Sequence, residues 1–324
     1  MLSNVATETR TVGLVGARGH VGAELVTLLA QHPAFRLSYA SSRALAGERV
    51  EGHAAASSSE LRFEDLPPEA IADREADLVI LAVPNGAASE YANVLLERGD
   101  DAPVIIDMSA DYRFDDNWVY GLTEHTRERL ATATRISNPG CYATAAQLAI
   151  RPLLSLLAAP PHCFGISGYS GAGTTPSPKN DPVVLEHGLL PYQLVDHLHE
   201  REMERQLGVP VRFSPHVAAF FRGISMTTQA TLLEGTTPEE ITDVYRAAYD
   251  GCKMIDVVGE SAPRVQGVAH RDGARIGGIS VHPRDPTRVA VVSVIDNLRK
   301  GAASQAIQNA NLALGLPEHT GLHA

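Results

Sequence analysis

Cys141 has the sequence environment of a reactive thiol. It follows Asn138-Pro139-Gly140 and precedes a helical run in "ISNPGCYATAAQLAI", residues 136–150. A thiol at a helix N-terminus experiences the positive end of the helix dipole, which favours the thiolate, and free backbone amides there can receive an oxyanion. The residue types therefore predict a nucleophile for acyl transfer. Cys163, inside an apolar run, and Cys252 are predicted to be buried structural residues.

An acyl-transfer thiol requires a group that carries its proton. His216, in "RFSPHVAAFFRGI", is the best-framed imidazole, because it leaves a short β run beside Pro215 and precedes Arg222 by six residues. The sequence cannot show that this ring approaches Cys141, and a structural histidine remains an alternative. Five other histidines are weaker candidates: His187, His197, His199, His270 and His282.

Arg113 is a candidate anion-binding residue. It lies in "DMSADYRF", at the end of a predicted parallel strand, where α/β sheets bind ligands. Its guanidinium could hold a phosphate or a carboxylate. An ion pair with Asp111 or Asp115 is the alternative interpretation.

The stretch "GARGHVG" has Gly16, Gly19 and Gly22 at GxxGxxG spacing, directly after a β run and at the start of a helix. Backbone amides at such a helix start can bind a pyrophosphate, and the glycines allow it to approach. Arg18 could add a positive contact. A glycine turn without a ligand is the alternative, which the N-terminal βαβ context disfavours.

The end of the second strand, "YASSRALAG", indicates which dinucleotide is bound. NAD enzymes usually place an acidic residue there for the ribose hydroxyls. This chain instead has Ser41, Ser42 and Arg43, which suit a 2′-phosphate. The sequence therefore predicts NADP(H), with a solvated Arg43 as the alternative.

The elements that position these residues follow from the hydrophobic pattern. Alternating strands and helices over 1–140 predict an α/β, Rossmann-type, doubly wound parallel sheet. After Cys141, a helical run with a join at Pro152 precedes β runs that predict an α+β catalytic and dimerisation domain with a mostly antiparallel sheet. Two of these runs, 274–283 and 288–296, are separated by a predicted turn through Arg284-Asp285-Pro286. We expect an NADP-binding domain of 1–140, completed by a C-terminal helix in 297–324, and a catalytic domain of 141–296.

Composition excludes several classes of protein. The chain has 324 residues and a formal net charge of −11, which disfavours nucleic acid and anionic membranes as partners. Three cysteines do not form a disulfide framework, and no cysteine or histidine spacing predicts a metal site. The polar N-terminus and the lack of a run of about 20 apolar residues predict a cytoplasmic protein.

Taken together and in order, the motifs resemble those of N-acetyl-gamma-glutamyl-phosphate reductases, from about residue 11 to about residue 315. The motifs are the glycine loop, "DMSADYR", "NPGCYATA", "SGYSGAG", "PHVAAFFRGI" and "DNLRKGAASQAIQNAN". "SGYSGAGTTPSPKNDP" and "PYQLVDHLHERE" are most similar to the reductase part of a fungal bifunctional precursor. The resemblance implies NADPH-dependent reduction of N-acetyl-L-glutamyl 5-phosphate to the 5-semialdehyde in arginine biosynthesis, through a cysteine thioester.

The resemblance also implies residue roles. Cys141 is the nucleophile and His216 the general acid/base. Arg113 and Arg222 bind substrate anions, and Ser170 lines the substrate side of the loop 170–173. The implied cofactor-binding residues are Gly16, Arg18, Gly19, His20, Val21, Gly22, Ser41, Ser42, Arg43, Pro84, Gly171 and Asn297. Arg18 and His20 depart from the usual loop, which has a small hydroxyl residue and an aromatic residue there.

Several alternatives stay open at this point. A sister acyl-phosphate reductase of lysine-type biosynthesis would act on a carrier-linked substrate, and aspartate-semialdehyde dehydrogenase shares the architecture. Two hypotheses from other functional classes are a non-catalytic NADP-binding sensor and a cysteine hydrolase. The family also implies a homo-oligomer, either a dimer or a tetramer, acting on a small acyl phosphate.

Overall fold

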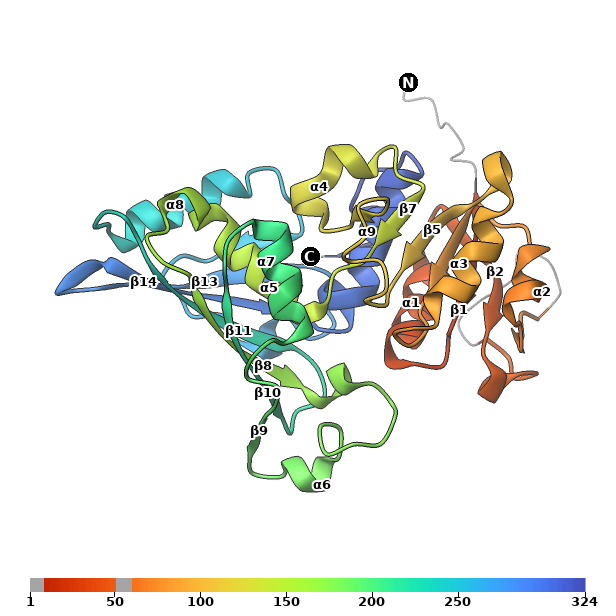
Figure 1. Ribbon diagram of the computed structural model, residues 1–324, viewed down its shortest axis with the longest axis horizontal. Helices are drawn as coiled ribbons and strands as arrows, with labels where there is room; N and C mark the ends of the chain where they lie inside the picture. The colour runs from red at the N-terminus through yellow and green to blue at the C-terminus, as the bar shows by residue number, and fades with distance from the viewer. Residues whose placement is uncertain (1–8, 51–59, 324) are drawn as a thin grey trace. The chain divides into compact units, whose positions relative to one another are not determined.

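The computed structural model describes residues 9–50 and 60–323, which form two compact units. The first contains the chain up to Asn138 together with Ala306–Leu322. The second begins at Pro139 and runs to Gln305. Residues 297–305, which we expected in the first domain, therefore pack within the second unit. Each unit has its own sheet (Figure 1).

The first unit is built on a seven-stranded sheet of order β3-β2-β1-β4-β5-β7-β6, and every pair of neighbouring strands is parallel. From β1 the chain crosses to β2 on one side, and from β4 it crosses to β5 on the other side. Because both crossovers are right-handed, the connecting helices α1 and α3 lie on opposite faces of the sheet. The strands are β1 Arg10–Val15, β2 Phe35–Ser41, β3 Phe63–Glu64, β4 Leu78–Leu81, β5 Val104–Asp107, β6 Val119–Tyr120 and β7 Arg135–Ser137. The helices are α1 His20–Gln31, α2 Pro68–Ala72, α3 Ala88–Leu96 and α4 Thr123–Leu130.

The predicted doubly wound parallel sheet is confirmed. Every residue of β4 is buried, as the uninterrupted apolar run predicts for a central parallel strand. Residues from α2 and α3, including Ile71 and Leu95, pack against Val79, Leu81 and Ile105 on one face. The loops after β1, β2, β4 and β5 emerge at the carboxyl edge of the sheet, where such folds bind ligands.

The second unit contains a seven-stranded mixed sheet of order β12-β13-β14-β11-β8-β10-β9. Pairs β10–β8 and β12–β13 are parallel and the other four pairs are antiparallel, which confirms the predicted mostly antiparallel sheet. The strands are β8 His162–Gly168, β9 Leu189–Pro191, β10 Arg212–Ala218, β11 Ile224–Thr231, β12 Ile255–Val257, β13 Ala274–His282 and β14 Asp285–Ile295. The helices are α5 Cys141–Ile150, α6 Pro182–Leu185, α7 Leu198–Leu207 and α8 Pro238–Ala248.

Helix α5 is the centre of the second unit's core. It has buried residues on all sides, which explains its mostly apolar sequence. It packs on β11 and β14 and against α7 (Figure 1). The expected join at Pro152 is present, since a 3₁₀ helix, Arg151–Leu156, follows α5. We call the sheet face under α5 the covered face and the opposite one the uncovered face.

The predicted turn between β13 and β14 differs in position. Asp285 already pairs with His282, so the turn contains only Pro283 and Arg284. Pro286 is tolerated inside β14 because it falls in an irregular stretch of the ladder, before regular pairing resumes at Val289.

The predicted C-terminal helix is present and begins with an irregular turn. A π-helix, Arg299–Ala303, leads into α9, Ser304–Ala313. Single π turns inside α-helices often occur at functional sites. Among the helices of residues 9–50 and 60–323, none combines the length and the apolar content that a membrane crossing requires.

Candidate active site

The glycine loop after β1 is shaped for a bulky anion. Gly16 has a φ of +87°, and a Cβ there would lie 2.3 Å from the carbonyl oxygen of Ala82. A Cβ at Gly22 would lie 2.6 Å from the Gly16 oxygen, whereas one at Gly19 would meet nothing within 4 Å. Gly16 and Gly22 are therefore required for the tight turn, and Gly19 leaves open space beside the helix start.

Helix α1 begins without a capping side chain or an acidic residue in its first turn. Its first amides are therefore not neutralised by the helix's own residues, and the N-terminus suits a phosphate group. Arg18 is exposed, and His20 and Val21 are half-buried at the first two helical positions. The residues present fit a dinucleotide pyrophosphate.

The end of β2 contacts the glycine loop directly. The Ser41 carbonyl accepts hydrogen bonds from the amides of Gly16 (3.1 Å) and Ala17 (3.0 Å). Ser41 and Ser42 are buried, and the Ser42 hydroxyl caps the short turn that follows by accepting from the Leu45 amide. The Arg43 side chain is 90% exposed and lies 3.7 Å from Asp65. Arg43 is thus a surface cation next to the cofactor loop.

Pro84 is exposed on the loop after β4, and that loop is tied to the next one. Asp111 accepts hydrogen bonds from the amides of Gly86 (2.7 Å) and Ala88 (3.0 Å), and Asn85 accepts one from the Ala110 amide. Asp111 therefore caps α3. This role differs from the ion pair with Arg113 that we considered as the alternative.

Arg113 is nearly buried, and its guanidinium is oriented by backbone carbonyls. Its Nε donates to the Asn138 oxygen at 2.9 Å and its Nη2 to the Met108 oxygen at 3.1 Å. Asn138 stands three residues before Cys141 in the chain. Within the first unit, Arg113 is thus held by the carbonyl of Asn138, where the main segment of that unit ends, at the carboxyl edge of the sheet.

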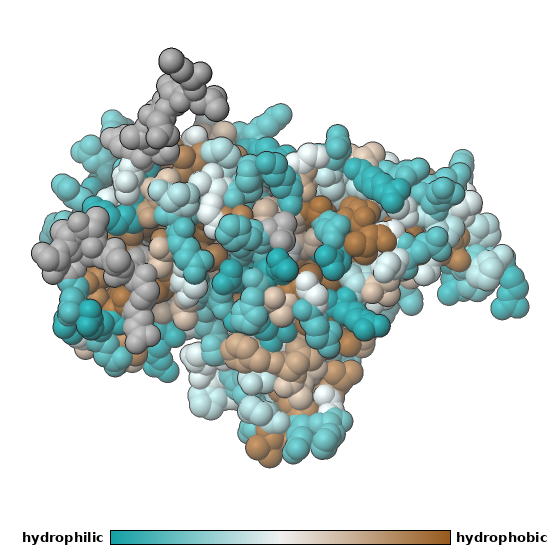
Figure 2. Space-filling view, turned by 180° about the vertical axis from the view of Figure 1, so that it is seen from behind, coloured by the Kyte–Doolittle hydropathy of each residue, from teal (hydrophilic) through white to brown (hydrophobic). Residues whose placement is uncertain are grey.

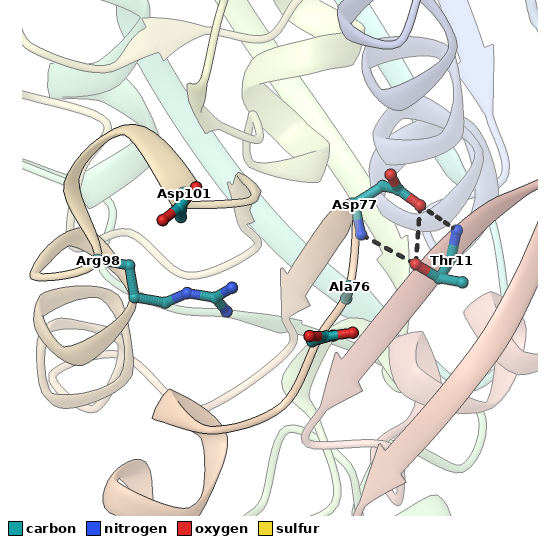
Figure 3. A pocket seen from close by; sticks show the side chains of 6 residues that line it. Thr11, Ala76, Asp77, Arg98 and Asp101 are labelled. Carbon is teal, nitrogen blue, oxygen red and sulfur yellow. Dashed lines mark hydrogen bonds between the residues drawn. The ribbon is translucent and has the colours of Figure 1, made fainter.

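A separate cavity of about 680 Å³ lies at the opposite edge of this sheet (Figure 3). Thr11 and Asp77, which are hydrogen-bonded to each other there, precede most of β1 and all of β4. Dinucleotides bind at the carboxyl edge of such sheets, so this cavity is not the cofactor site.

In the second unit, Cys141 is the first residue of α5 and the only one of the three cysteines that is not buried. Gly140 precedes it as the N-cap. Burial raises the pKa of Cys163 to about 12, partly offset by a contact with Thr228. Cys252 is also buried. The structure thus has one half-buried cysteine, Cys141, and two buried ones.

Two further contacts fix the start of α5. The Gly140 amide donates to Glu202, a fully buried carboxylate on α7, at 2.8 Å. A Cβ at Gly301, in the π-helix, would lie only 2.8 Å from the Cβ of Cys141. Sequence analysis missed both residues. Glu202 stands one helical turn after His199, a spacing that could have indicated a shared face.

His216 lies on the uncovered face of the sheet. Its ring packs against that of Phe164 at a tilt, with centroids 4.6 Å apart, whereas Phe213, on the same strand, points the other way, into the core. On the covered face, the Tyr142 ring packs against His199 at 5.9 Å and against Phe213 at 5.1 Å. The structure therefore brings His199, rather than the His216 ring, to the side of the sheet that carries α5.

Asn297, Ser170 and Gly223 meet at one point of the second unit. Asn297 is buried, accepts from the Gly223 amide at 2.6 Å and donates to the Ser170 hydroxyl at 3.0 Å. Gly171 is next to this contact, since a Cβ there would lie 3.5 Å from the Asn297 amide nitrogen. The structure thus brings these predicted residues together.

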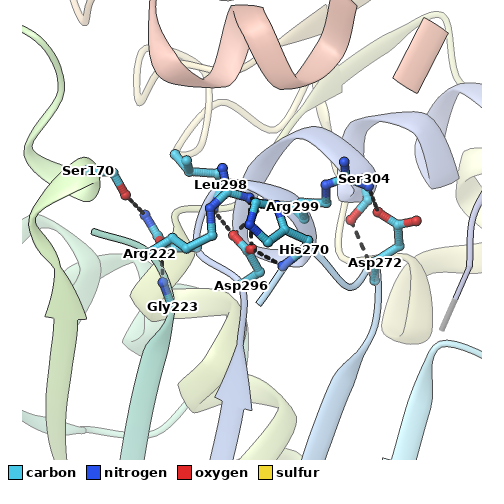
Figure 4. Close-up of polar contacts among 10 residues, drawn as sticks. Ser170, Arg222, Gly223, His270, Asp272, Asp296, Leu298, Arg299 and Ser304 are labelled. Carbon is cyan, nitrogen blue, oxygen red and sulfur yellow. Dashed lines mark hydrogen bonds and ion pairs between the residues drawn. The ribbon is translucent and has the colours of Figure 1, made fainter. Parts of the chain in front are cut away.

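Arg222 belongs to the adjoining network in Figure 4. Its guanidinium pairs at 3.1 Å with Asp296, which is fully buried, and lies 2.9 Å from the His270 ring. Asp296 also accepts from the backbone amides of His270, Leu298 and Arg299. Arg222 is therefore held in one orientation beside Asn297.

Residues 11–133 match the family described as "Semialdehyde dehydrogenase, NAD binding domain" and residues 141–297 match "Semialdehyde dehydrogenase, dimerisation domain". The chain is 53% identical over 311 residues to N-acetyl-gamma-glutamyl-phosphate reductase of Xanthomonas axonopodis pv. citri (strain 306), covering 96% of this chain and 98% of that one. It is 50% identical over 318 residues to the reductase of the same name from Xylella fastidiosa (strain M23), covering 98% and 96%.

This chain belongs to the N-acetyl-gamma-glutamyl-phosphate reductase family. The resemblance inferred from the motifs is confirmed, and the chain is an oxidoreductase whose first unit binds a nicotinamide cofactor. A structure of a probable aspartate-semialdehyde dehydrogenase from Pseudomonas aeruginosa is similar to this reductase, with a TM-score of 0.72, 26% identity and 94% and 98% coverage. Aspartate semialdehyde dehydrogenase II from Vibrio cholerae has the same fold (TM-score 0.78, 17% identity, 95% and 99% coverage).

Proposed function

We propose that this reductase converts N-acetyl-L-glutamyl 5-phosphate to N-acetyl-L-glutamate 5-semialdehyde and phosphate in arginine biosynthesis, with Cys141 as the nucleophile. The observation that carries the proposal is the partly accessible thiol at the first residue of α5, in a chain 53% identical to reductases of that name. The helix N-terminus favours the thiolate that the attack requires.

The Cys141 thiolate attacks the acyl phosphate carbonyl, so that a C–S bond forms, the C–O bond to phosphate breaks and inorganic phosphate leaves. The backbone amides at the start of α5 are the candidate donors for the oxyanion that develops. Glu202 holds the Gly140 amide, which fixes the turn that presents the sulfur.

Bound cofactor supplies the hydride that reduces the thioester carbon. Asn297, fixed by Ser170 and Gly223, is the proposed side chain beside the nicotinamide, and Gly171 borders the same point. The tetrahedral hemithioacetal on Cys141 then collapses, the C–S bond breaks and the aldehyde leaves. A thioester accepts hydride more readily than a carboxylate, which explains the use of a covalent intermediate.

Two histidine side chains are candidates for the general acid/base, the group that transfers the proton in this reaction. His216 is the candidate from sequence, and His199 is the candidate favoured by geometry, because its ring lies on the covered face against Tyr142. His199 also stands one turn before Glu202, whose carboxylate reaches the turn that carries Cys141. We infer that His199 moves the proton.

The cofactor is proposed to be NADP(H). Arg43 and Arg18 are exposed cations beside the glycine loop, and Ser42 stands between the loop and Arg43. This charge suits a 2′-phosphate, because arginine binds phosphate through charge-assisted hydrogen bonds. Arg113 and Arg222, each held in a fixed orientation, are the proposed contacts for the substrate's anionic groups.

We also propose a homo-oligomer, a dimer or a tetramer, in a reducing cytoplasmic setting. The second unit matches a dimerisation domain, and large apolar side chains are exposed around α6 and β9, where Figure 2 shows brown surface. They are Val183, Val184, Leu189, Leu194 and Val195. Light scattering of the purified chain measures the assembly directly.

The reverse reaction tests the function. We expect NADP reduction that requires both inorganic phosphate and N-acetyl-glutamate 5-semialdehyde. A sensor would bind NADP without turnover, and a cysteine hydrolase would not reduce it. Aspartate semialdehyde as the better substrate would indicate the aspartate enzyme. Activity confined to a carrier-linked semialdehyde would indicate the lysine-type reductase.

A further inference from the structure

Lys179 is a cation to which the proposed mechanism assigns no role. It lies in the loop between Gly173 and α6, and its ammonium is 4.9 Å from the centroid of the Tyr192 ring. The side chain is half-buried, and within residues 9–50 and 60–323 no carboxylate forms an ion pair with it. A cation held on an aromatic face keeps its charge available to an incoming anion.

The loop that carries Lys179 is ordered by the next residue. The Asn180 amide nitrogen donates to the carbonyls of Gly173 and Thr175, both at 2.8 Å, and its oxygen accepts from the Ser177 amide at 2.8 Å. The Lys179 backbone is thereby fixed without a ligand. Such preorganisation lowers the entropy cost of binding.

Tyr192 belongs to a cluster of rings at the first turn of α5, which we call the aromatic cluster: Tyr142, Tyr192, His197, His199 and Phe213. The Tyr192 ring is 5.5 Å from His197, which is 6.4 Å from Tyr142. Burial raises the pKa of Tyr192, and the charge of the Cys141 thiolate raises it further. The ring beneath the Lys179 ammonium is therefore within electrostatic reach of the nucleophile.

The charge of Lys179 also reaches the inside of the aromatic cluster. The pKa of His197 is lowered to about 4, first by burial and then by the positive charges of Lys179 and Arg201. His197 is therefore neutral at pH 7, and its Nδ1 accepts from the His199 amide. The Lys179 ammonium, rather than the His197 ring, is therefore available as a cation for an anionic substrate.

We propose that Lys179 binds the α-carboxylate of the N-acetyl-glutamyl substrate and is a specificity-determining residue of this reductase. The inference rests on the proposed function, which supplies a substrate with a carboxylate at one end and an acyl phosphate at the other. An ammonium can hold a carboxylate as a point charge, and the planar donors of arginine match a phosphate as well as a carboxylate. Arg113 and Arg222 are the proposed arginines for the phosphate end.

A first experiment measures the charge near Cys141 without turnover. The full chain is alkylated with iodoacetate, an anion, or iodoacetamide, its neutral analogue, and modification of Cys141 is followed by peptide mass spectrometry. We expect the iodoacetate-to-iodoacetamide rate ratio to fall about fivefold or more in Lys179→Met, because the ammonium attracts the anionic reagent. Lys253→Met, which removes an exposed lysine elsewhere in the second unit, is the matched control. An unchanged ratio in Lys179→Met would overturn the proposal.

A second experiment identifies the anion by steady-state kinetics of the reverse reaction. Lys179→Met should raise the KM for the semialdehyde about 10- to 100-fold, the range for one hydrogen bond to a charged group, and leave the KM for phosphate within about twofold. Lys179→Arg should restore most of the affinity. The α-carboxamide of the semialdehyde should be used equally by wild type and Lys179→Met. A rise in the phosphate KM alone would refute the carboxylate assignment.

The two experiments separate the inference from the function on which it rests. A wild-type chain without phosphate-dependent NADP reduction contradicts the proposed function, whatever the alkylation ratios are. An active wild type whose Lys179→Met variant keeps both KM values contradicts the role of Lys179 alone. Lys179→Gln, which keeps a polar side chain, repeats both measurements if the methionine variant is unstable.

Discussion

Gly301 lies against Cys141, so closely that a Cβ on residue 301 would come within 2.8 Å of the Cβ of the cysteine. The contact joins the π-helix to the first turn of α5 within the second unit. The nucleophile is thus positioned from two sides, by Gly301 and by the Gly140–Glu202 hydrogen bond.

We therefore expect Gly301→Ala to reduce kcat while the chain still folds. The added methyl group must displace Cys141, and a misplacement of about 1 Å can cost about 100-fold in rate. The measurement is kcat of the reverse reaction, beside cofactor affinity and the midpoint of thermal unfolding. Gly19→Ala is the comparison variant, because a Cβ at Gly19 meets open space and the change affects the cofactor loop rather than the nucleophile. Gly208→Ala is unsuitable, because the φ of +72° at that position would strain an alanine. Unchanged kcat in Gly301→Ala would mean that the contact does not position the sulfur.

Cys141→Ser should fold, bind NADP and lose nearly all turnover. A hydroxyl is far less ionised than a thiol at neutral pH, so attack on the acyl phosphate fails, while the glycine loop in the first unit is unaffected. Cys252→Ser, at a buried position, is the control for nonspecific effects of removing a thiol. Rates close to wild type in Cys141→Ser, measured in both directions, are incompatible with a covalent intermediate.

Whether an element of this fold could be predicted depends on the kind of pattern that it leaves in the sequence. Buried apolar runs predicted β4 and β5, since a central parallel strand has no polar face to obscure it. Strands of two or three residues, such as β3 and β6, were missed because no periodicity can be read from so few residues.

The face on which a site residue lies could not be predicted in the same way. A shift of one residue in the start of β10 moves His216 from one face of the sheet to the other, and pairing with β8 and β9 fixes the register. Cys141 was found from sequence because a Pro-Gly turn before a helix is a local signal. Glu202 and Gly301 act through contacts between distant parts of the chain, which no local pattern encodes.

Replacing each of the two candidate imidazoles separates them. His199→Asn should lower the rate of thioester formation about 10²- to 10⁴-fold, the usual contribution of a general acid/base, and His216→Asn by less than about fivefold. The measurement is the burst of phosphate release in a single turnover, which isolates the first chemical step. A larger effect of His216→Asn than of His199→Asn would identify His216 as the general acid/base and would contradict the argument from the position of the His199 ring.

Arg43→Ala should weaken NADPH and leave NADH nearly unchanged. The guanidinium is 90% exposed and its neighbour Asp65 is 3.7 Å away, so its removal costs the fold little. Loss of one charge-assisted hydrogen bond predicts a rise of about tenfold or more in the Kd for NADPH. Arg246→Ala, at another exposed ion pair, controls for net charge. Equal effects on the two cofactors would contradict the 2′-phosphate contact.

His32 should make the stability of the first unit depend on pH. Its Nδ1 accepts from the amides of Ala34 and Phe35, and its Nε2 contacts Asn311 and the Thr320 carbonyl at 3.1 and 3.0 Å. The neutral ring with the proton on Nε2 satisfies all four contacts. Burial lowers the pKa of His32 from the ordinary 6.5, although the contacts with Asn311 and Thr320 oppose the shift.

Because the folded pKa lies below the unfolded one, the unfolded chain binds the proton first as the pH falls. The contribution of His32 to the free energy of unfolding should therefore be constant above about pH 7, then decrease by at most about 1.4 kcal/mol per pH unit below pH 6.5, until its folded pKa is reached. Thermal unfolding midpoints between pH 8 and pH 5 measure this. In His32→Asn, whose side-chain oxygen can still accept from the Ala34 amide, the decrease should be smaller by the contribution of one proton. Identical pH profiles for the two proteins would show that His32 stays equally protonated in the folded and unfolded chain.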